Sequence, residues 1–154
     1  MRTKLVVGNW KMHGEQTSNE SLLRTLRSGL SPDACDVSVC VPVIYIPQAA
    51  QLLIESAVSW GAQDCSAHQQ GAFTGEISAA MLSDFGCKHV IVGHSERRQY
   101  HQENNELVAQ KMLRALETGL SVIVCVGETL VQLQDSQTLD VVGAQVQSVI
   151  KALK

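Results

Sequence analysis

The residues of this chain best suited to chemistry lie at positions 92–98, in the string Val-Gly-His-Ser-Glu-Arg-Arg. The apolar run at 88–92 is typical of a buried parallel strand, and the charged residues after it are typical of a helix start. His94 is therefore predicted at the junction between them. Unpaired backbone N–H groups at a helix start carry partial positive charge, which favours the neutral imidazole. A neutral imidazole can donate a hydrogen bond to a substrate oxygen, so this position suits chemistry at a carbonyl group.

A second polar pair, Asn9 and Lys11, lies two residues apart in a predicted strand over 4–11. Residues at this spacing project from the same face of a strand. Both lie near its carboxyl end, which is where parallel α/β proteins bind their ligands. An amide and an ammonium there could hold an anionic substrate. Spacing alone does not exclude a simpler interpretation, in which Asn9 and Lys11 are solvated and His94 is a surface histidine.

The elements that must position these residues follow from the hydrophobic pattern. Apolar runs predict five strands, at 4–11, 36–41, 58–63, 88–92 and 121–126. Helical spacing and end signals predict helices that begin near Thr17 or Ser18, Pro47, Ser78, Asn104 and Thr138. The helix from Asn104 is predicted to bury Val108, Met112 and Leu116, and Gly119 is predicted to end it.

Strand and helix thus alternate five times, which predicts a parallel sheet covered by helices. The pattern alone does not show whether this sheet is an open sheet or part of a barrel. On length alone, 154 residues favour an open, doubly wound sheet, because a (β/α)8 barrel typically needs about 250 residues. No linker, low-complexity tract or charge block marks a boundary, so residues 1–154 are predicted to form a single domain.

Composition narrows the partners. The chain carries 12 basic and 15 acidic side chains and no basic patch, which argues against a nucleic-acid partner. It has no apolar run long enough for a signal peptide or a membrane span, so no membrane association is expected. Five cysteines without paired spacing predict reduced thiols in a cytoplasmic protein. Cys65-x-x-His68 lacks a second half, so no metal site is predicted, and no Gly-rich nucleotide-binding string is present.

Five short sequence strings favour a functional role for the polar residues described above. They are Gly-Asn-Trp-Lys-Met at 8–12, Gln-Asp at 63–64, Gly-Ala-Phe-Thr-Gly-Glu at 71–76, the string at 92–98 and Cys-Val-Gly-Glu at 125–128. All five closely resemble signatures of the triosephosphate isomerase family, in the family's order and at its spacing. The resemblance covers the chain from Lys4 onwards.

This resemblance implies a parallel (β/α)8 TIM barrel, present here as an incomplete barrel of about five β/α units. It also implies an isomerase that interconverts dihydroxyacetone phosphate and D-glyceraldehyde 3-phosphate through an enediolate, in glycolysis and gluconeogenesis. A base removes a proton next to the carbonyl while a hydrogen-bond donor stabilises the developing oxyanion. The family needs no metal or organic cofactor for this reaction.

The roles implied by the resemblance can be carried over by position. Asn9 and Lys11 match the family's substrate-binding pair, with Lys11 as the cation that faces the substrate. His94 matches the electrophile that polarises the carbonyl and moves protons between the two oxygens. Glu96 matches a carboxylate that pairs with the lysine, and Ser95 matches a residue that contacts the catalytic carboxylate in the open state.

The string at 71–76 matches the loop that inserts into the partner subunit of a homodimer. The resemblance therefore implies interface roles for Gly71, Phe73, Thr74, Gly75 and Glu76, with Thr74 reaching towards the partner's active site. The alternative is an ordinary surface connection between a strand and a helix.

The sequence also departs from the family. No string matches the general-base glutamate after the sixth strand, the lid that follows it or the Gly-rich phosphate loops. We therefore expect this chain to be inactive alone and its first and fifth strands to be open edges. Three interpretations remain. The chain is part of a longer isomerase, half of a split barrel completed by a second chain, or a non-catalytic fragment that acts as an assembly or binding module or forms an open five-stranded sheet.

Overall fold

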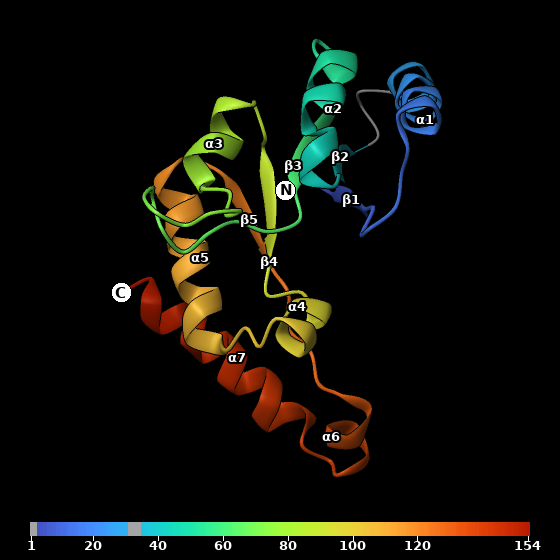
Figure 1. Cartoon of the computed structure of the whole chain (residues 1–154). Coiled ribbons are helices and arrows are strands. Elements are labelled where there is room, and N and C mark those ends of the chain that lie inside the picture. The colour runs from blue at the N-terminus through green and yellow to red at the C-terminus, as the bar shows by residue number, and fades with distance from the viewer. Residues whose placement is uncertain (1–2, 31–34) are drawn as a thin grey trace.

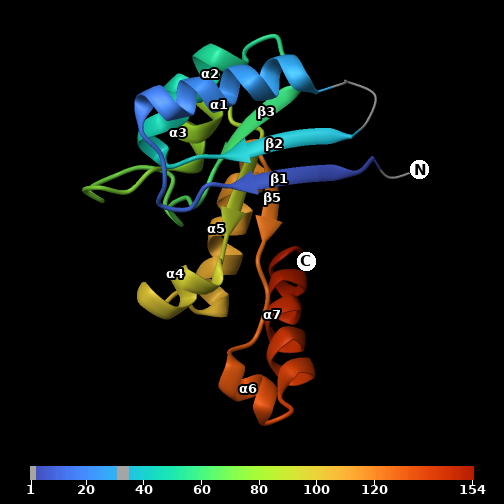
Figure 2. The ribbon, with the colours of Figure 1, turned by 90° about the vertical axis from the view of Figure 1, so that its right-hand side faces the viewer.

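A computed structural model describes residues 3–30 and 35–154 of the chain. One sheet of five parallel strands runs through it, in the order β1-β2-β3-β4-β5. The strands are β1 Leu5–Asn9, β2 Asp36–Cys40, β3 Val58–Ala62, β4 His89–Val92 and β5 Ser121–Val124. In Figure 2, β1 and β2 run across the view whereas β4 and β5 run down it, so the sheet is strongly curled.

Helices cover the outer face of this curled sheet (Figure 1). They are α1 Gln16–Gly29, the 3₁₀ turn η1 Val43–Tyr45, α2 Ile46–Leu53, α3 Ala79–Asp84, α4 Ser95–Tyr100, α5 Asn105–Glu117, α6 Leu130–Gln134 and α7 Thr138–Ala152. Helix α1 packs on α2, α5 packs on β4 and β5, and α7 packs on α5. Within the described residues, no helix is long and apolar enough to cross a membrane.

The strand order decides between the two sheet architectures. A doubly wound sheet reverses direction at a switch point, which places helices on both faces. Here every strand lies beside its neighbour in sequence, so each crossover moves the chain in the same direction around the sheet. The open, doubly wound sheet expected from length is therefore wrong. The incomplete parallel barrel implied by the resemblance is confirmed.

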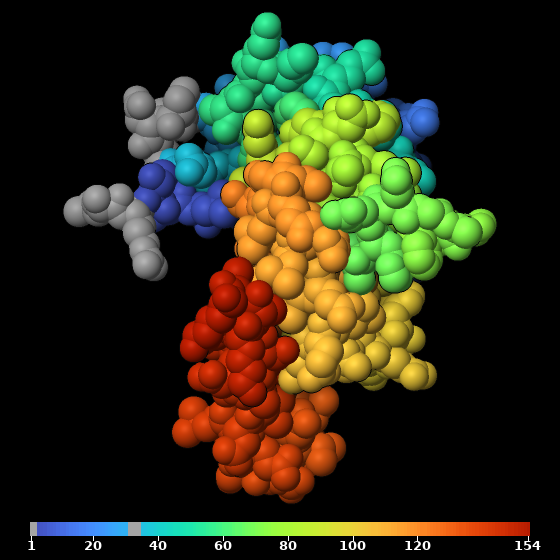
Figure 3. Space-filling view, turned by 90° about the vertical axis from the view of Figure 1, so that its left-hand side faces the viewer, coloured from blue at the N-terminus to red at the C-terminus, as the bar shows by residue number. Residues whose placement is uncertain are grey.

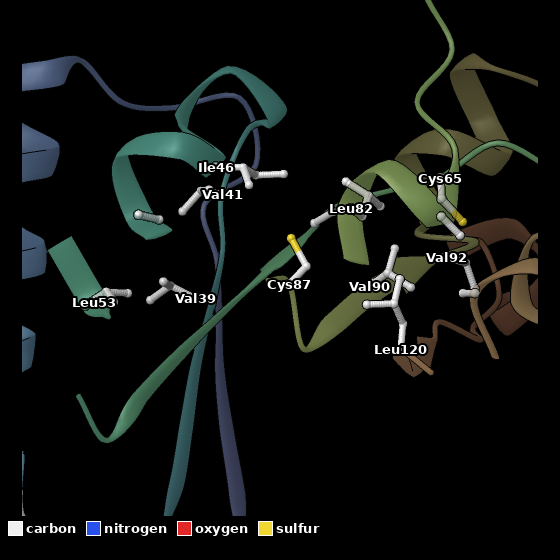
Figure 4. Packing of buried hydrophobic residues seen from close by; sticks show 14 of the residues in the cluster. Val39, Val41, Ile46, Leu53, Cys65, Leu82, Cys87, Val90, Val92 and Leu120 are labelled. Carbon is white, nitrogen blue, oxygen red and sulfur yellow. The ribbon is translucent and has the colours of Figure 1, made fainter. Parts of the chain in front are cut away.

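The main core lies between the strands and the helices. Register partners on parallel strands share a face, and Val37 pairs with Val58 as Ala62 pairs with Val90. Most side chains on this face are buried against apolar residues of α2, α3 and α5, while Val37 and Trp60 are partly buried. Figure 4 shows one group around Val39, Val41, Ile46 and Leu53 and a second around Leu82, Val90, Val92 and Leu120.

The concave face of the sheet carries smaller and more polar residues. His89 on β4 reaches across β3 to Ser38 on β2, with 3.1 Å between Nδ1 and Oγ. Gly61 lies between them on β3, and a Cβ there would come within 2.3 Å of the His89 carbonyl oxygen. The glycine is therefore required for β3 and β4 to approach this closely.

The burial of His89 makes the free energy of unfolding depend on pH. Burial lowers the pKa of His89 below 6.5, while Asp36 acts weakly in the opposite direction. The unfolded chain therefore takes up a proton at a higher pH than the folded chain does. The free energy of unfolding is expected to fall as the pH drops through about 6.5 and to level off below the folded pKa. Urea unfolding between about pH 7.5 and 5.5 measures this decline. It should be shallower in His89→Gln, and equal slopes would count against the interpretation.

Several predicted ends are confirmed and others are wrong. Ser78 and Asn104 cap α3 and α5, with their side-chain oxygens accepting from the backbone N–H three residues later. Helix α1 begins earlier than predicted, because its N-cap is Glu15 rather than Thr17 or Ser18, and no side chain caps it. Thr138 is the first residue of α7 rather than its cap. Its hydroxyl instead donates to the Glu128 carboxylate at 3.1 Å.

Gly93 joins β4 to α4 in a left-handed conformation, with φ of 68°. A Cβ at this position would lie 2.7 Å from Val108. Gly93→Ala is therefore expected to lower the free energy of unfolding by about 1–3 kcal/mol, through backbone strain and overpacking. Gly143→Ala is the matched control, because Gly143 lies inside α7 and a Cβ there meets nothing within 4 Å. It should raise stability by about 0.5–1 kcal/mol. Urea titration of both variants checks the opposite signs, and a neutral Gly93→Ala would contradict the argument.

Candidate active site

Four of the predicted residues line one hollow of about 570 Å³. Asn9 ends β1, Lys11 follows it, and His94 and Glu96 lie just after β4, so the hollow opens at the carboxyl ends of the strands. The remaining lining residues are Met12, His13, Gln63, Asp64, Arg97, Tyr100 and His101. The structure thus brings an amide, an ammonium, an imidazole and a carboxylate together from segments that are 85 residues apart.

Lys11 does not reach this hollow in the way that its spacing predicts. The strand ends at Asn9, and Lys11 lies in a turn with φ of 51°. The prediction that both residues project from one face of a strand is therefore wrong. The backbone N–H of Lys11 donates instead to Oδ1 of Asn9 at 3.0 Å, so the Asn9 side chain supports the turn. A left-handed non-glycine residue costs on the order of 1–3 kcal/mol and is typical of a functional site.

Glu96 contacts both basic side chains. Its Oε1 lies 2.6 Å from Nζ of Lys11, and its Oε2 lies 2.9 Å from Nδ1 of His94. The hydrogen bond from Lys11, with a smaller contribution from the charge of His94, holds the pKa of Glu96 below its usual range. The carboxylate therefore stays ionised at neutral pH and orients the ammonium and the imidazole relative to each other.

His94 lies at the junction of β4 and α4, as the sequence predicts, and its side chain caps the helix. Its Nδ1 lies 3.4 Å from the backbone N of Glu96, close enough to accept from that N–H. The two neighbours of Nδ1 make opposite demands, because the amide donates whereas the carboxylate accepts. The carboxylate contact is the shorter one and favours a proton on Nδ1 in this structure. Donation from Nε2 of a neutral ring requires the amide to be the partner of Nδ1.

Two of the predicted groups lie outside the hollow. Ser95 is the first residue of α4, is exposed and is not among the lining residues. Residues 71–76 form an exposed loop that projects from the body of the molecule (Figure 2, green). Within this loop the ring of Phe73 stacks on that of His68 at 3.8 Å between centroids. Gly71 and Gly75 both have positive φ, which fits the tight turns of the loop.

A cluster of charged side chains beside the hollow was not predicted from the sequence. Lys111 on α5 contacts both carboxylate oxygens of Asp64 at 2.8 Å and Oε1 of Glu103 at 2.6 Å. Arg97 contacts the same two carboxylates at 2.8 and 2.6 Å. Burial raises the pKa of Asp64. Burial also opposes ionisation of Glu103, but the hydrogen bonds from Lys111 and Arg97 hold its pKa below the usual range.

Asp64 and Arg97 belong to two of the singled-out strings, and this was the available signal that they lie near the site. Their pairing depends on tertiary structure, since Lys111 is 47 residues from Asp64. Within the described residues, no group of three or more His, Cys, Asp or Glu side chains is arranged to hold a metal ion.

Comparison with known proteins agrees with this geometry. The family model for triosephosphate isomerase matches residues 4–154. A triosephosphate isomerase from Herminiimonas arsenicoxydans is 54% identical over 153 residues, which is 99% of this chain and 62% of that relative. The enzyme of the same name from Cupriavidus taiwanensis is 53% identical over 153 residues, again with 99% and 62% covered.

Among solved structures, triosephosphate isomerase from Bartonella henselae matches with a TM-score of 0.91 and 36% sequence identity. The match covers 97% of this chain and 62% of that structure. The chain therefore spans about 62% of the length of the relatives it matches.

Proposed function

This chain belongs to the triosephosphate isomerase family, and we propose that it supplies the electrophilic half of an isomerase active site. The reaction is the interconversion of dihydroxyacetone phosphate and D-glyceraldehyde 3-phosphate through an enediolate, as a step of glycolysis and gluconeogenesis. The observation that carries the proposal is the convergence of Asn9, Lys11, His94 and Glu96 on one hollow at the carboxyl ends of the strands. No cofactor is required by this chemistry.

Each residue has a role that its position supports. Lys11 binds the anionic substrate and stabilises the developing oxyanion, and Asn9 holds the turn that presents it. His94 donates from Nε2 to the carbonyl oxygen and moves a proton between the two oxygens. Glu96 orients Lys11 through Oε1, and its backbone N–H is the partner of Nδ1 that donation from Nε2 requires. Ser95, exposed at the start of α4, is available to contact the catalytic carboxylate in the open state.

Proton abstraction needs a general base, and no string among the 154 residues matches the family's base glutamate. We therefore expect residues 1–154 alone to show no useful turnover. A complete site requires the β/α units that follow in the relatives, whether on the same chain or on a second one.

The complete protein is proposed to act as a cytoplasmic homodimer. The projecting loop with Phe73 and Thr74 supports this arrangement, because its residues are exposed and extend away from the body of the chain. Free cysteines support a reducing compartment, since all five are unpaired in the described residues. The mildly acidic composition supports a small-molecule substrate rather than nucleic acid.

A second candidate, an assembly module or half of a split barrel, is favoured by exposed apolar surface. Val6 on the edge strand β1 is 57% exposed, and Leu139 on α7 is 86% exposed. In Figure 3, α7 (red) lies along α5, and its other side is uncovered. Surfaces of this kind mark places where further β/α units or another chain would pack.

One experiment separates these functions. Residues 1–154 are mixed with a polypeptide that carries the remaining β/α units of a relative, and isomerisation of the triose phosphates is measured. We expect no turnover from either part alone and turnover from the mixture, lost again with His94→Gln. A stable complex without activity would support the assembly module and overturn the isomerase proposal. Full activity of residues 1–154 alone would disprove the need for the missing base.

A further inference from the structure

Arg98 holds the peptide groups on both sides of His94. Its Nε donates to the carbonyl oxygen of Gly93 at 2.8 Å. Its backbone N–H donates to the carbonyl oxygen of His94 at 3.1 Å. The peptide groups before and after the imidazole-bearing residue are therefore fixed by one side chain and its own backbone.

The rest of the guanidinium joins two further segments. Nη1 donates to Oδ1 of Asn105, the first residue of α5, at 2.8 Å. Nη2 donates to the carbonyl oxygen of Cys125, just after β5, at 3.2 Å. The planar fork has a fixed geometry, so three anchored nitrogens leave Arg98 little freedom to move. Arg98 is not among the residues that line the hollow, so any effect on the site acts through His94.

The anchors are themselves held by α7. The Gln145 side chain, which is buried, accepts from the Gly127 N–H at 2.8 Å and donates to the Gly127 carbonyl oxygen at 2.9 Å. Ser148 donates to the carbonyl oxygen of Asn105 at 3.1 Å. Hydrogen bonds thus extend from α7, through the loop after β5 and the start of α5, to the turn that carries His94.

The turn has no spare room to rearrange. A Cβ on Gly93 would lie 2.7 Å from Val108 and 3.0 Å from Nη2 of Arg98. The position of the His94 ring relative to the amide of Glu96 therefore depends on the packing around Gly93. That amide is the partner which a proton on Nε2 requires.

We propose that Arg98 is a positioning residue for His94, which fixes the turn so that the Glu96 amide lies within reach of Nδ1, as the partner that a proton on Nε2 requires. The proposal rests on the proposed role of His94 as electrophile. A purely structural arginine would contribute stability without determining where the imidazole proton lies. The two roles therefore differ in what they do to the spectrum of His94.

Nitrogen NMR of the chain labelled in its histidine rings tests this directly. Arg98→Met and Arg98→Lys are expected to shift the His94 ring nitrogens and to change the balance of its two tautomers. Asn105→Ala keeps the guanidinium and removes one of its hydrogen-bond partners, so it should give a smaller shift. This variant decides the test if neither Arg98 variant folds. Arg27→Met is the control, because Arg27 also bonds a backbone carbonyl, that of Leu52, at 2.8 Å between α1 and α2. Unchanged His94 resonances in any folded Arg98 variant, or in Asn105→Ala if neither Arg98 variant folds, would overturn the proposal.

Kinetics of the completed barrel provide a second readout. Arg98→Met should lower kcat by about 10²-fold with little change in KM, as expected for a misplaced catalytic group. Arg27→Met should leave kcat and KM near those of the unsubstituted protein. If it lowers kcat as much as Arg98→Met does, Arg98 has only a structural role. If the unsubstituted chain shows no activity when mixed with the remaining β/α units, the result counts against the proposed function but not against the role of Arg98. The NMR result does not depend on turnover.

Discussion

Replacing Lys111 with methionine is expected to lower the free energy of unfolding by about 3–5 kcal/mol. The Lys111 side chain is only 6% exposed and neutralises two carboxylates, those of Asp64 and Glu103. Methionine fills a similar volume, but it leaves both carboxylates short of a cation in a site that is largely closed to water. Since small domains are stable by about 5–15 kcal/mol, this single change should remove much of the stability.

Arg97 limits the damage without repairing it. It contacts the same carboxylates, but its side chain is 30% exposed and its guanidinium already makes these bonds in the unsubstituted chain. Oε2 of Glu103 is buried and has no hydrogen-bond partner among the described residues. Glu103 is therefore the carboxylate that loses most when the positive charge of Lys111 is removed. Adding Glu103→Gln to Lys111→Met should recover part of the loss, because one uncompensated buried charge is then removed.

Urea unfolding of the two variants measures this effect. Lys151→Met is the control, because Lys151 lies exposed near the end of α7 and makes no ion pair within the described residues. The control should stay within about 0.5 kcal/mol of the unsubstituted chain. A loss of less than about 1 kcal/mol for Lys111→Met would show that the cluster is not the main electrostatic support of this region.

The sequence predicts those parts of the fold that depend on local signals. Strand and helix alternation, the Ser78 and Asn104 caps and the His94 junction follow from periodicity and capping chemistry, and the structure agrees with each. The direction in which the strands succeed one another has no local signal. Length alone therefore favoured the wrong sheet, and only the five family strings indicated a barrel.

Other errors have tertiary causes. Nothing in the local sequence indicates that Lys111 is buried, because its side chain pairs with carboxylates from other segments. Leu116 reads as part of the buried stripe, yet it is exposed and Ala115 is buried instead, because the packed face of α5 is rotated from the predicted one. Helix α6 was not predicted although Thr129 and Gln132 form a capping box, because its five residues are too few to show a helical period.

In the completed barrel, Lys11→Met is expected to lower kcat/KM by at least about 10³-fold, which corresponds to about 4 kcal/mol of transition-state stabilisation. Two losses combine in this variant. The ammonium that would bind the anionic substrate is gone, and Glu96 loses the partner that lies 2.6 Å from its Oε1. The freed carboxylate still lies beside Nδ1 of His94, so it should hold the imidazole proton on the wrong nitrogen.

This coupling predicts how a second substitution behaves. Glu96→Gln added to Lys11→Met should recover part of the lost kcat, because the neutral amide no longer competes with the backbone N–H for Nδ1 of His94. Steady-state kinetics of the single and double variants measure the coupling. Lys4→Met, which changes an exposed lysine just before β1, is the control and should keep full activity. A kcat/KM of Lys11→Met within tenfold of that of the unsubstituted protein would show that Lys11 does not have the proposed catalytic role. Strictly additive effects would mean that Lys11 and Glu96 act independently, and no effect of Glu96→Gln in the Lys11→Met background would mean that Glu96 acts through the lysine alone.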